Sequence, residues 1–187
     1  MSLIDFTEIK FVEIKNSDIV FSKKTHLWCK LPYPNHPKGC PNYNRNPLCP
    51  PFANYMDYIK NIYSRFYLVY ANFKLKSQKE RMLLLHPNWT EKKANCLLYW
   101  QSSVKKALRN YIQEIILKNK NREIYILACG SGFNFSNISQ DKIYSMEAVG
   151  VNVLKTLKNA GIEYELKPKN KVVLTTLLCS QEKLLLS

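Results

Sequence analysis

The sequence predicts an α/β or α+β fold in which helices flank a mixed β-sheet, together with one long proline-rich cysteine loop. Apolar runs typical of strands alternate with segments of helical periodicity along the chain. Hydrophobic residues make up 46% of the 187 residues, which is enough for one buried core. No internal repeat or linker divides the sequence. We therefore expect a single domain over residues 1–187.

The N-terminal half is expected to begin with a hairpin. Residues 7–21 alternate apolar and polar side chains on either side of a turn-prone Asn-Ser-Asp triplet at 16–18. After the cysteine loop, apolar side chains recur at helical spacing over residues 52–66. The segment 66–75 then reads as a strand, and residues 77–86 as a short helix.

The longest expected helix follows. Asn88 or Thr90 can cap its start, and its periodicity continues to about Leu117. This is the most basic element in the chain.

The C-terminal part is expected to add three strands and one helix. Strand patterns cover residues 123–129, 162–166 and 171–179. Between the first two of these, residues 144–161 read as a helix with Ser145 as its cap.

The charge balance favours anionic partners. Lys and Arg number 28 against 14 Asp and Glu, a net charge of +14, which attracts polyanions such as RNA and also suits docking on an acidic redox partner protein. A solvated basic surface is the alternative. The candidate nucleic-acid-binding residues, all on the predicted long helix, are Lys92, Lys93, Lys105, Lys106 and Arg109.

The sequence predicts a cytoplasmic protein with no membrane partner. No segment approaches the roughly 18 to 20 apolar residues of a spanning helix, and residues 1–15 lack the apolar core of a signal peptide. Thiols stay reduced in that compartment, so the six cysteines are expected to be metal ligands, nucleophiles or core residues.

Residues 26–51 form the cysteine loop, with the sequence HLWCKLPYPNHPKGCPNYNRNPLCPP. Seven of the nine prolines lie in it, which excludes a regular helix or central strand. Loops of this length usually carry function. Cys29, Cys40 and Cys49 supply soft thiolates, which select iron–sulfur clusters, zinc or copper(I). Proline follows two of these cysteines, as in ferredoxin-type sequences, so we expect an iron–sulfur cluster of the 4Fe–4S type, with zinc as the alternative.

Three cysteines leave a fourth ligand position to fill. Cys96 is the first candidate, with a small core residue as its alternative. Cys129, which ends a predicted strand, could be a ligand, a nucleophile or a buried strand residue. His36 and His26 also compete, although each fits a surface or turn position. His26 with the three loop cysteines would make a closed, structural Cys₃His zinc site.

Two patches of the sequence resemble an uncharacterised family of predicted metal-binding proteins. The first is Cys40-Pro41-Asn42-Tyr43 followed by Cys49-Pro50-Pro51, and the second is similar to the family's S-M-E-A-x-G stretch at residues 145–150. The family usually carries a second cysteine cluster just before that stretch, where this chain keeps only Cys129. The resemblance implies a metal centre of the iron–sulfur type and carries no established reaction.

Three functions fit these observations. The first is an iron–sulfur protein that performs redox or sulfur chemistry on an RNA or nucleotide substrate. The second is a zinc-stabilised nucleic-acid-binding module without catalysis. The third is an electron-transfer accessory subunit whose basic face docks on a redox partner protein. The sequence leaves open whether the protein is an enzyme.

Overall fold

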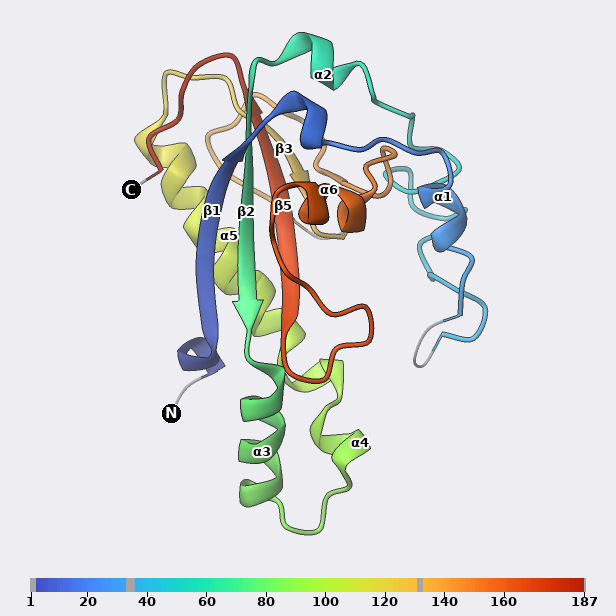
Figure 1. Ribbon diagram of the computed structural model, residues 1–187. Helices are drawn as coiled ribbons and strands as arrows, with labels where there is room; N and C mark the ends of the chain where they lie inside the picture. The colour runs from blue at the N-terminus through green and yellow to red at the C-terminus, as the bar shows by residue number, and fades with distance from the viewer. Residues whose placement is uncertain (1–2, 33–35, 131–132, 187) are drawn as a thin grey trace.

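The computed structural model describes residues 3–32, 36–130 and 133–186. Its centre is a sheet with the strand order β1-β2-β5-β3-β4 (Figure 1). The strands are β1 (Thr7–Ile14), β2 (Arg65–Phe73), β3 (Tyr125–Ala128), β4 (Tyr144–Ser145) and β5 (Val172–Ser180). All neighbours pair antiparallel except β3 and β4, which are parallel. The predicted fold class, a mixed sheet flanked by helices, is confirmed.

Helices cover both faces of this sheet. The α-helices are α1 (Thr25–Trp28), α2 (Ile59–Ile62), α3 (Leu75–Leu85), α4 (Glu91–Ala94), α5 (Gln101–Lys118) and α6 (Val153–Asn159). Three 3₁₀ turns complete the elements of the described residues: η1 (Leu3–Phe6), η2 (Asn16–Asp18) and η3 (Leu97–Tyr99). Figure 1 shows α5 on one face of the sheet and α6 on the other. Within the described part of the chain, none of the helices has the length and apolar character needed to cross a bilayer.

Alternation along β2 divides the core into two layers. Tyr67 and Val69 point to the face covered by α5 and share a buried cluster with Leu108. Leu68 points to the opposite face and shares the other cluster with Leu157 of α6. The sheet is therefore buried on both faces around β2 and β5.

The expected N-terminal hairpin is wrong. β1 pairs with β2 along its whole length, from Thr7 opposite Phe73 to Ile14 opposite Phe66. The chain after η2 contributes only an isolated bridge, formed by Phe21. Burial explains the difference, because pairing with β2 joins β1 to the central strands of the core, which a local hairpin would not do.

The single long helix is also wrong. Thr90 caps a helix as expected, since its Oγ1 accepts a hydrogen bond from the Lys93 amide at 3.3 Å, but α4 ends at Ala94 and α5 begins only at Gln101. Between them the chain turns so that Trp100 is 1% exposed and stacks on Phe73 with the ring centroids 4.7 Å apart. Burial of this large ring outweighs the continuous helical periodicity.

Three further elements differ from expectation. The helix expected over 52–66 is reduced to the single turn α2, and that expected over 144–161 is reduced to α6. Residues 162–166 form no strand, because the amide of Ile162 donates to the carbonyl of Leu157 at 2.9 Å and so belongs to the end of α6.

Candidate metal centre

The cysteine loop projects at the side of the sheet and begins with α1 (Figure 1). Cys29 directly follows this helix, and its carbonyl accepts a 2.7 Å hydrogen bond from the amide of Cys40. Gly39 makes this approach possible. Its φ is +86°, and a Cβ atom there would lie 2.5 Å from the Cys29 carbonyl oxygen. The first two predicted ligands are therefore neighbours in the backbone.

The stretch from Cys40 to Cys49 is held by its own turns. The amide of Tyr43 donates to the Cys40 carbonyl at 3.1 Å, and the amide of Cys49 donates to the Asn46 carbonyl at 2.9 Å. The amide of Asn44 reaches the carbonyl of Pro50 at 2.9 Å and closes the stretch on itself. These bonds order the third cysteine relative to the second.

Residues 145–150, which we call the anchor segment, hold both ends of the cysteine loop. On the side that precedes the loop, Ser22 donates its amide to the Gly150 carbonyl at 2.7 Å, and the Thr25 hydroxyl donates to the Glu147 carbonyl at 3.0 Å. On the side that follows it, the amide of Met56 donates to the Val149 carbonyl at 3.0 Å. The two sequence patches that resemble one family are thus in one structural unit.

The three loop thiols also influence one another electrostatically. Burial raises the pKa of Cys29 to about 11, with further increases from Cys40, Cys49 and the Glu147 carboxyl. Burial and the neighbouring Cys40 raise the pKa of Cys49 as well. Like charges at short range disfavour the simultaneous ionisation of these thiols unless a cation compensates them. A bound metal would supply that compensation.

The side chains as they stand do not yet form a coordination sphere. No three His, Cys, Asp or Glu side chains among the described residues are gathered closely enough to hold one metal ion. The donor set itself fits a thiophilic metal, because three cysteines share one loop with ordered turns.

The structure places the fourth-ligand candidates in different regions. His26 lies one helical turn before Cys29, and its Nε2 atom is buried without a hydrogen-bond partner among the described residues. Cys96 lies between α4 and η3, and Figure 1 shows α4 at the lower end of the molecule, away from α1. The structure therefore does not bring Cys96 to the loop. His36 is within the loop and half-buried.

Cys129 lies outside the cysteine loop, and its charged neighbours are Lys105 and Glu147 of the anchor segment. Burial raises its pKa to about 12, the Lys105 ammonium opposes that rise, and the Glu147 carboxyl adds to it. Burial also raises the pKa of Glu147, and Lys105 again acts in the opposite direction. These surroundings fit the buried end of a strand better than an activated nucleophile, because a protonated thiol is a weak nucleophile.

Comparison with models of protein families shows which family the chain belongs to. A family model described as "Predicted metal-binding protein (DUF2284)" matches residues 12–179, which is most of the chain. The chain belongs to this family. No curated protein and no solved structure gave a significant match. The family description supports metal binding and specifies neither the metal nor a reaction.

In this member of the DUF2284 family, a cleft of about 510 Å³ opens beside Cys49. One wall consists of loop residues around Cys49, and the other comes from the stretch between β3 and β4. The residues of the two walls are Asn46, Leu48, Cys49, Phe133, Asn134, Phe135, Ile138, Gln140, Asp141, Lys142, Ile143 and Ser145. We did not predict this second wall from the sequence, because an irregular stretch has no periodicity to mark it. Its position just before the anchor segment was the available signal.

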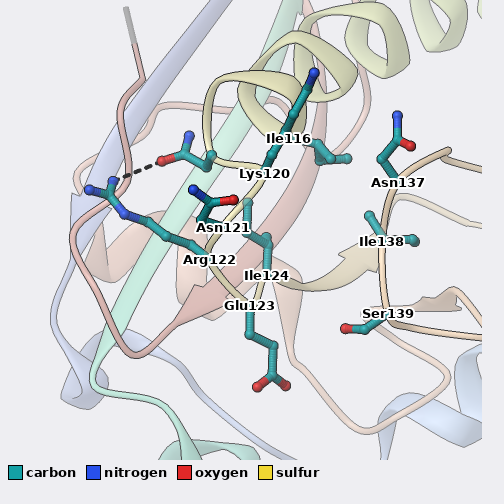
Figure 2. A pocket seen from close by; sticks show the side chains of 10 residues that line it. Ile116, Lys120, Asn121, Arg122, Glu123, Ile124, Asn137, Ile138 and Ser139 are labelled. Carbon is teal, nitrogen blue, oxygen red and sulfur yellow. Dashed lines mark hydrogen bonds between the residues drawn. The ribbon is translucent and has the colours of Figure 1, made fainter.

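A second cavity, of about 680 Å³, lies at the C-terminal end of α5 and contains none of the predicted ligands. Figure 2 shows Asn137, Ile138 and Ser139 on one side of it and Arg122 pointing away from them. Arg122 is already engaged by the Asn119 side chain at 2.9 Å and the Glu182 carboxylate at 3.2 Å. This cavity offers no comparable donor set for a metal.

The predicted basic track is divided by the break between α4 and α5. Lys92 and Lys93 lie on α4, and the Nζ atom of Lys93 lies 4.4 Å from the centroid of the Trp89 ring. Lys105 reaches toward the end of β3, since its Nζ lies 3.5 Å from the position of a Cβ atom on Gly130. Lys106 is exposed and Arg109 is half-buried on α5. The five cations therefore do not share one helix face.

Proposed function

We propose that this protein holds an iron–sulfur cluster on the thiolates of Cys29, Cys40 and Cys49. The observation that carries the proposal is the joining of these three cysteines into one hydrogen-bonded loop whose two ends are tied to the anchor segment. A bound cluster would supply redox or sulfur chemistry. The protein residues would set its position and its access to solvent.

Two features favour an iron–sulfur cluster. Soft thiolate donors disfavour magnesium and calcium, and proline follows Cys40 and Cys49 as in ferredoxin-type sequences. A 4Fe–4S cluster with three cysteine ligands keeps one iron position available. Because Cys49 lines the open cleft, that position would be within reach of a small molecule.

The cleft suits a polar substrate such as a nucleotide or part of an RNA, and its two charged side chains, Lys142 and Asp141, are of opposite sign. Lys142 supplies a cation, Asn46 and Asn134 supply amide groups, and Phe133 and Phe135 supply apolar surface. The net charge of +14 would raise the local concentration of such a substrate. The proposed setting is the cytoplasm, where the thiols stay reduced. An electron-transfer accessory role would use the same cluster and the same basic surface toward an acidic redox partner protein.

Zinc is the second candidate, and one observation favours it. The buried Nε2 atom of His26 lacks a hydrogen-bond partner among the described residues and lies one turn before Cys29. A buried nitrogen without a partner is costly, and metal ligation would remove that cost. His26 with the three loop cysteines would make a closed Cys₃His site without catalysis.

Anaerobic purification followed by iron, sulfide and zinc analysis separates the two. The iron–sulfur proposal expects iron and acid-labile sulfide in the brown wild-type protein, and expects a His26→Ala variant to keep both. Stoichiometric zinc that is lost on His26→Ala substitution would contradict it and establish the zinc site.

The RNA part of the proposal has its own test. If Lys92 and Lys106 contact phosphates, their double substitution by alanine should lower the log–log salt slope of RNA binding by about 1.4 to 1.8. Lys105→Ala serves as the control, because Lys105 faces Gly130. Equal slopes in all three proteins would remove RNA from the proposal.

A further inference from the structure

The hairpin of α3 and α4 lies at the lower end of the molecule (Figure 1), and large apolar side chains are exposed on it and on the η3 turn that follows. Four exposed leucines, which we call the leucine tip, lie on this hairpin and on the η3 turn that follows it: Leu84 and Leu85 at the end of α3, and Leu97 and Leu98 in η3. Leu84 is 82% exposed and Leu98 is 80% exposed. Ring contacts from His86 through Trp89 to Tyr99 connect the end of α3 with η3. Exposed apolar side chains gathered in one region of a surface mark an interaction site.

Three aromatic side chains next to the leucine tip contact one another. His86 stacks on Trp89 with the ring centroids 4.0 Å apart, and Trp89 contacts Tyr99 with the centroids 5.0 Å apart. An ion pair from Lys79 to Glu91, at 3.2 Å, joins α3 to α4. The leucines are therefore displayed on an ordered hairpin.

The charge around the tip is cationic. Residues 74–99 contain six Lys or Arg against two Glu. Lys92 and Lys93 are exposed on α4, and the Lys93 ammonium lies over the Trp89 ring. Exposed apolar side chains with adjoining lysines and an aromatic belt match the requirements of a surface that inserts shallowly into an anionic bilayer. We propose that the leucine tip docks this protein on an anionic membrane surface.

Other occupants fit these observations less well. In a symmetric dimer through the tip, Lys92 and Lys93 of two copies would face one another in a chain of net charge +14. Stacked RNA bases need a free ring face, whereas Trp89 is already contacted by His86, Tyr99 and the Lys93 ammonium. A peripheral contact needs no spanning helix, so it does not conflict with the lengths of the described helices.

Vesicle flotation with the full-length protein tests the proposal. The vesicles are phosphatidylcholine alone and equal parts of phosphatidylcholine and phosphatidylglycerol. We expect wild-type protein to float with the anionic vesicles, and Leu84→Ser/Leu98→Ser to reduce that binding by about tenfold or more. The matched control is Ile62→Ser/Leu185→Ser, which removes two half-exposed apolar side chains elsewhere and should bind as wild type does. Lys92→Gln/Lys93→Gln should lose a similar factor on anionic vesicles.

Three results would overturn the proposal. The first is absence of wild-type binding to anionic vesicles. The second is equal loss in the tip variant and the control variant. The third is a leucine variant that floats as wild type does but has lost another interaction. That loss would be a sedimentation shift from dimer to monomer, or loss of RNA binding. Folding of each variant is checked by circular dichroism, and a blue shift of Trp89 emission on vesicle addition, absent in Trp89→Phe, adds an independent readout.

Discussion

The amide of Cys40 lies 2.7 Å from the carbonyl oxygen of Cys29, although ten residues separate the two cysteines in the sequence. This hydrogen bond closes the first half of the cysteine loop. It depends on Gly39, whose missing side chain leaves room for the Cys29 carbonyl. The arrangement of the proposed ligands therefore rests on a residue that binds no metal itself.

Substitution of Gly39 by alanine should open the loop. The new Cβ would meet backbone atoms of Cys29 and Lys30 within 3.0 Å, and the positive φ adds about 1–2 kcal/mol of strain. We expect Gly39→Ala to lower metal content severalfold. Gly161→Ala is the matched control, because Gly161 also has a positive φ but nothing within 4 Å. If the two variants retain metal equally, the close approach at Gly39 is not needed for the site.

The Thr25 hydroxyl should stabilise the start of the loop. It is fully buried, and its one proton is shared between the carbonyls of Glu147 and Ser22, each 3.0 Å from Oγ1. Thr25→Val leaves buried carbonyls without this donor and should lower the free energy of unfolding by about 1–3 kcal/mol. Thr25→Ser keeps the hydroxyl and should recover most of the loss. Urea unfolding measures the free energy of unfolding of both variants. If Thr25→Ser is no more stable than Thr25→Val, the loss of stability comes from packing and not from the hydrogen bond.

Cys49 and Cys179 should respond in opposite ways to substitution. Cys49→Ser removes a proposed ligand and should abolish brown colour and sulfide content while the fold remains. Cys179 is fully buried in β5, so Cys179→Ala should lower stability by a few kcal/mol at most and leave the metal bound. Elemental analysis and thermal unfolding measure the two effects. Equal metal loss in both variants would mean that unfolding, rather than removal of a ligand, releases the metal.

In the metal-free protein, alkylation of Cys29 should depend steeply on pH. Its pKa is raised from 9.0 to about 11, so at pH 7.5 only about one hundredth as much thiolate is present as in an unperturbed thiol. The iodoacetamide rate, followed by peptide mass spectrometry, should rise about tenfold per pH unit up to pH 10. A plateau near pH 9 would contradict the raised pKa. Because metal binding must release this proton, metal affinity should increase with pH over the same range.

The strands of the core were predictable because local patterns determine them. Alternation along 66–75 and the apolar run at 171–179 identify β2 and β5 closely. The partner of β1 was not predictable, since pairing of Thr7 with Phe73 joins segments that are far apart in the chain. The break before α5 was also hidden, because only the position of Phe73 explains why Trp100 must turn inward.

For the candidate site, the sequence identified Cys29, Cys40 and Cys49 as one loop but not what holds it. The role of residues 145–150 depends on backbone carbonyls, which every residue possesses and no composition signal marks. Cys96 could face the loop from the start of one long helix, but the chain breaks into α4 and α5 on either side of Cys96, so this position is not realised. His26 became the better-supported fourth candidate only through the burial of its Nε2 atom.

The most direct test of the central claim is an anomalous difference map, recorded at the iron absorption edge from crystals of anaerobically reconstituted protein. We expect one strong iron feature within bonding distance of the Sγ atoms of Cys29, Cys40 and Cys49, next to the cleft at Cys49. Two results would contradict the proposed cluster site. The first is iron bound at Cys96 or Cys129, and the second is a protein that contains iron while the three loop sulfurs bind none.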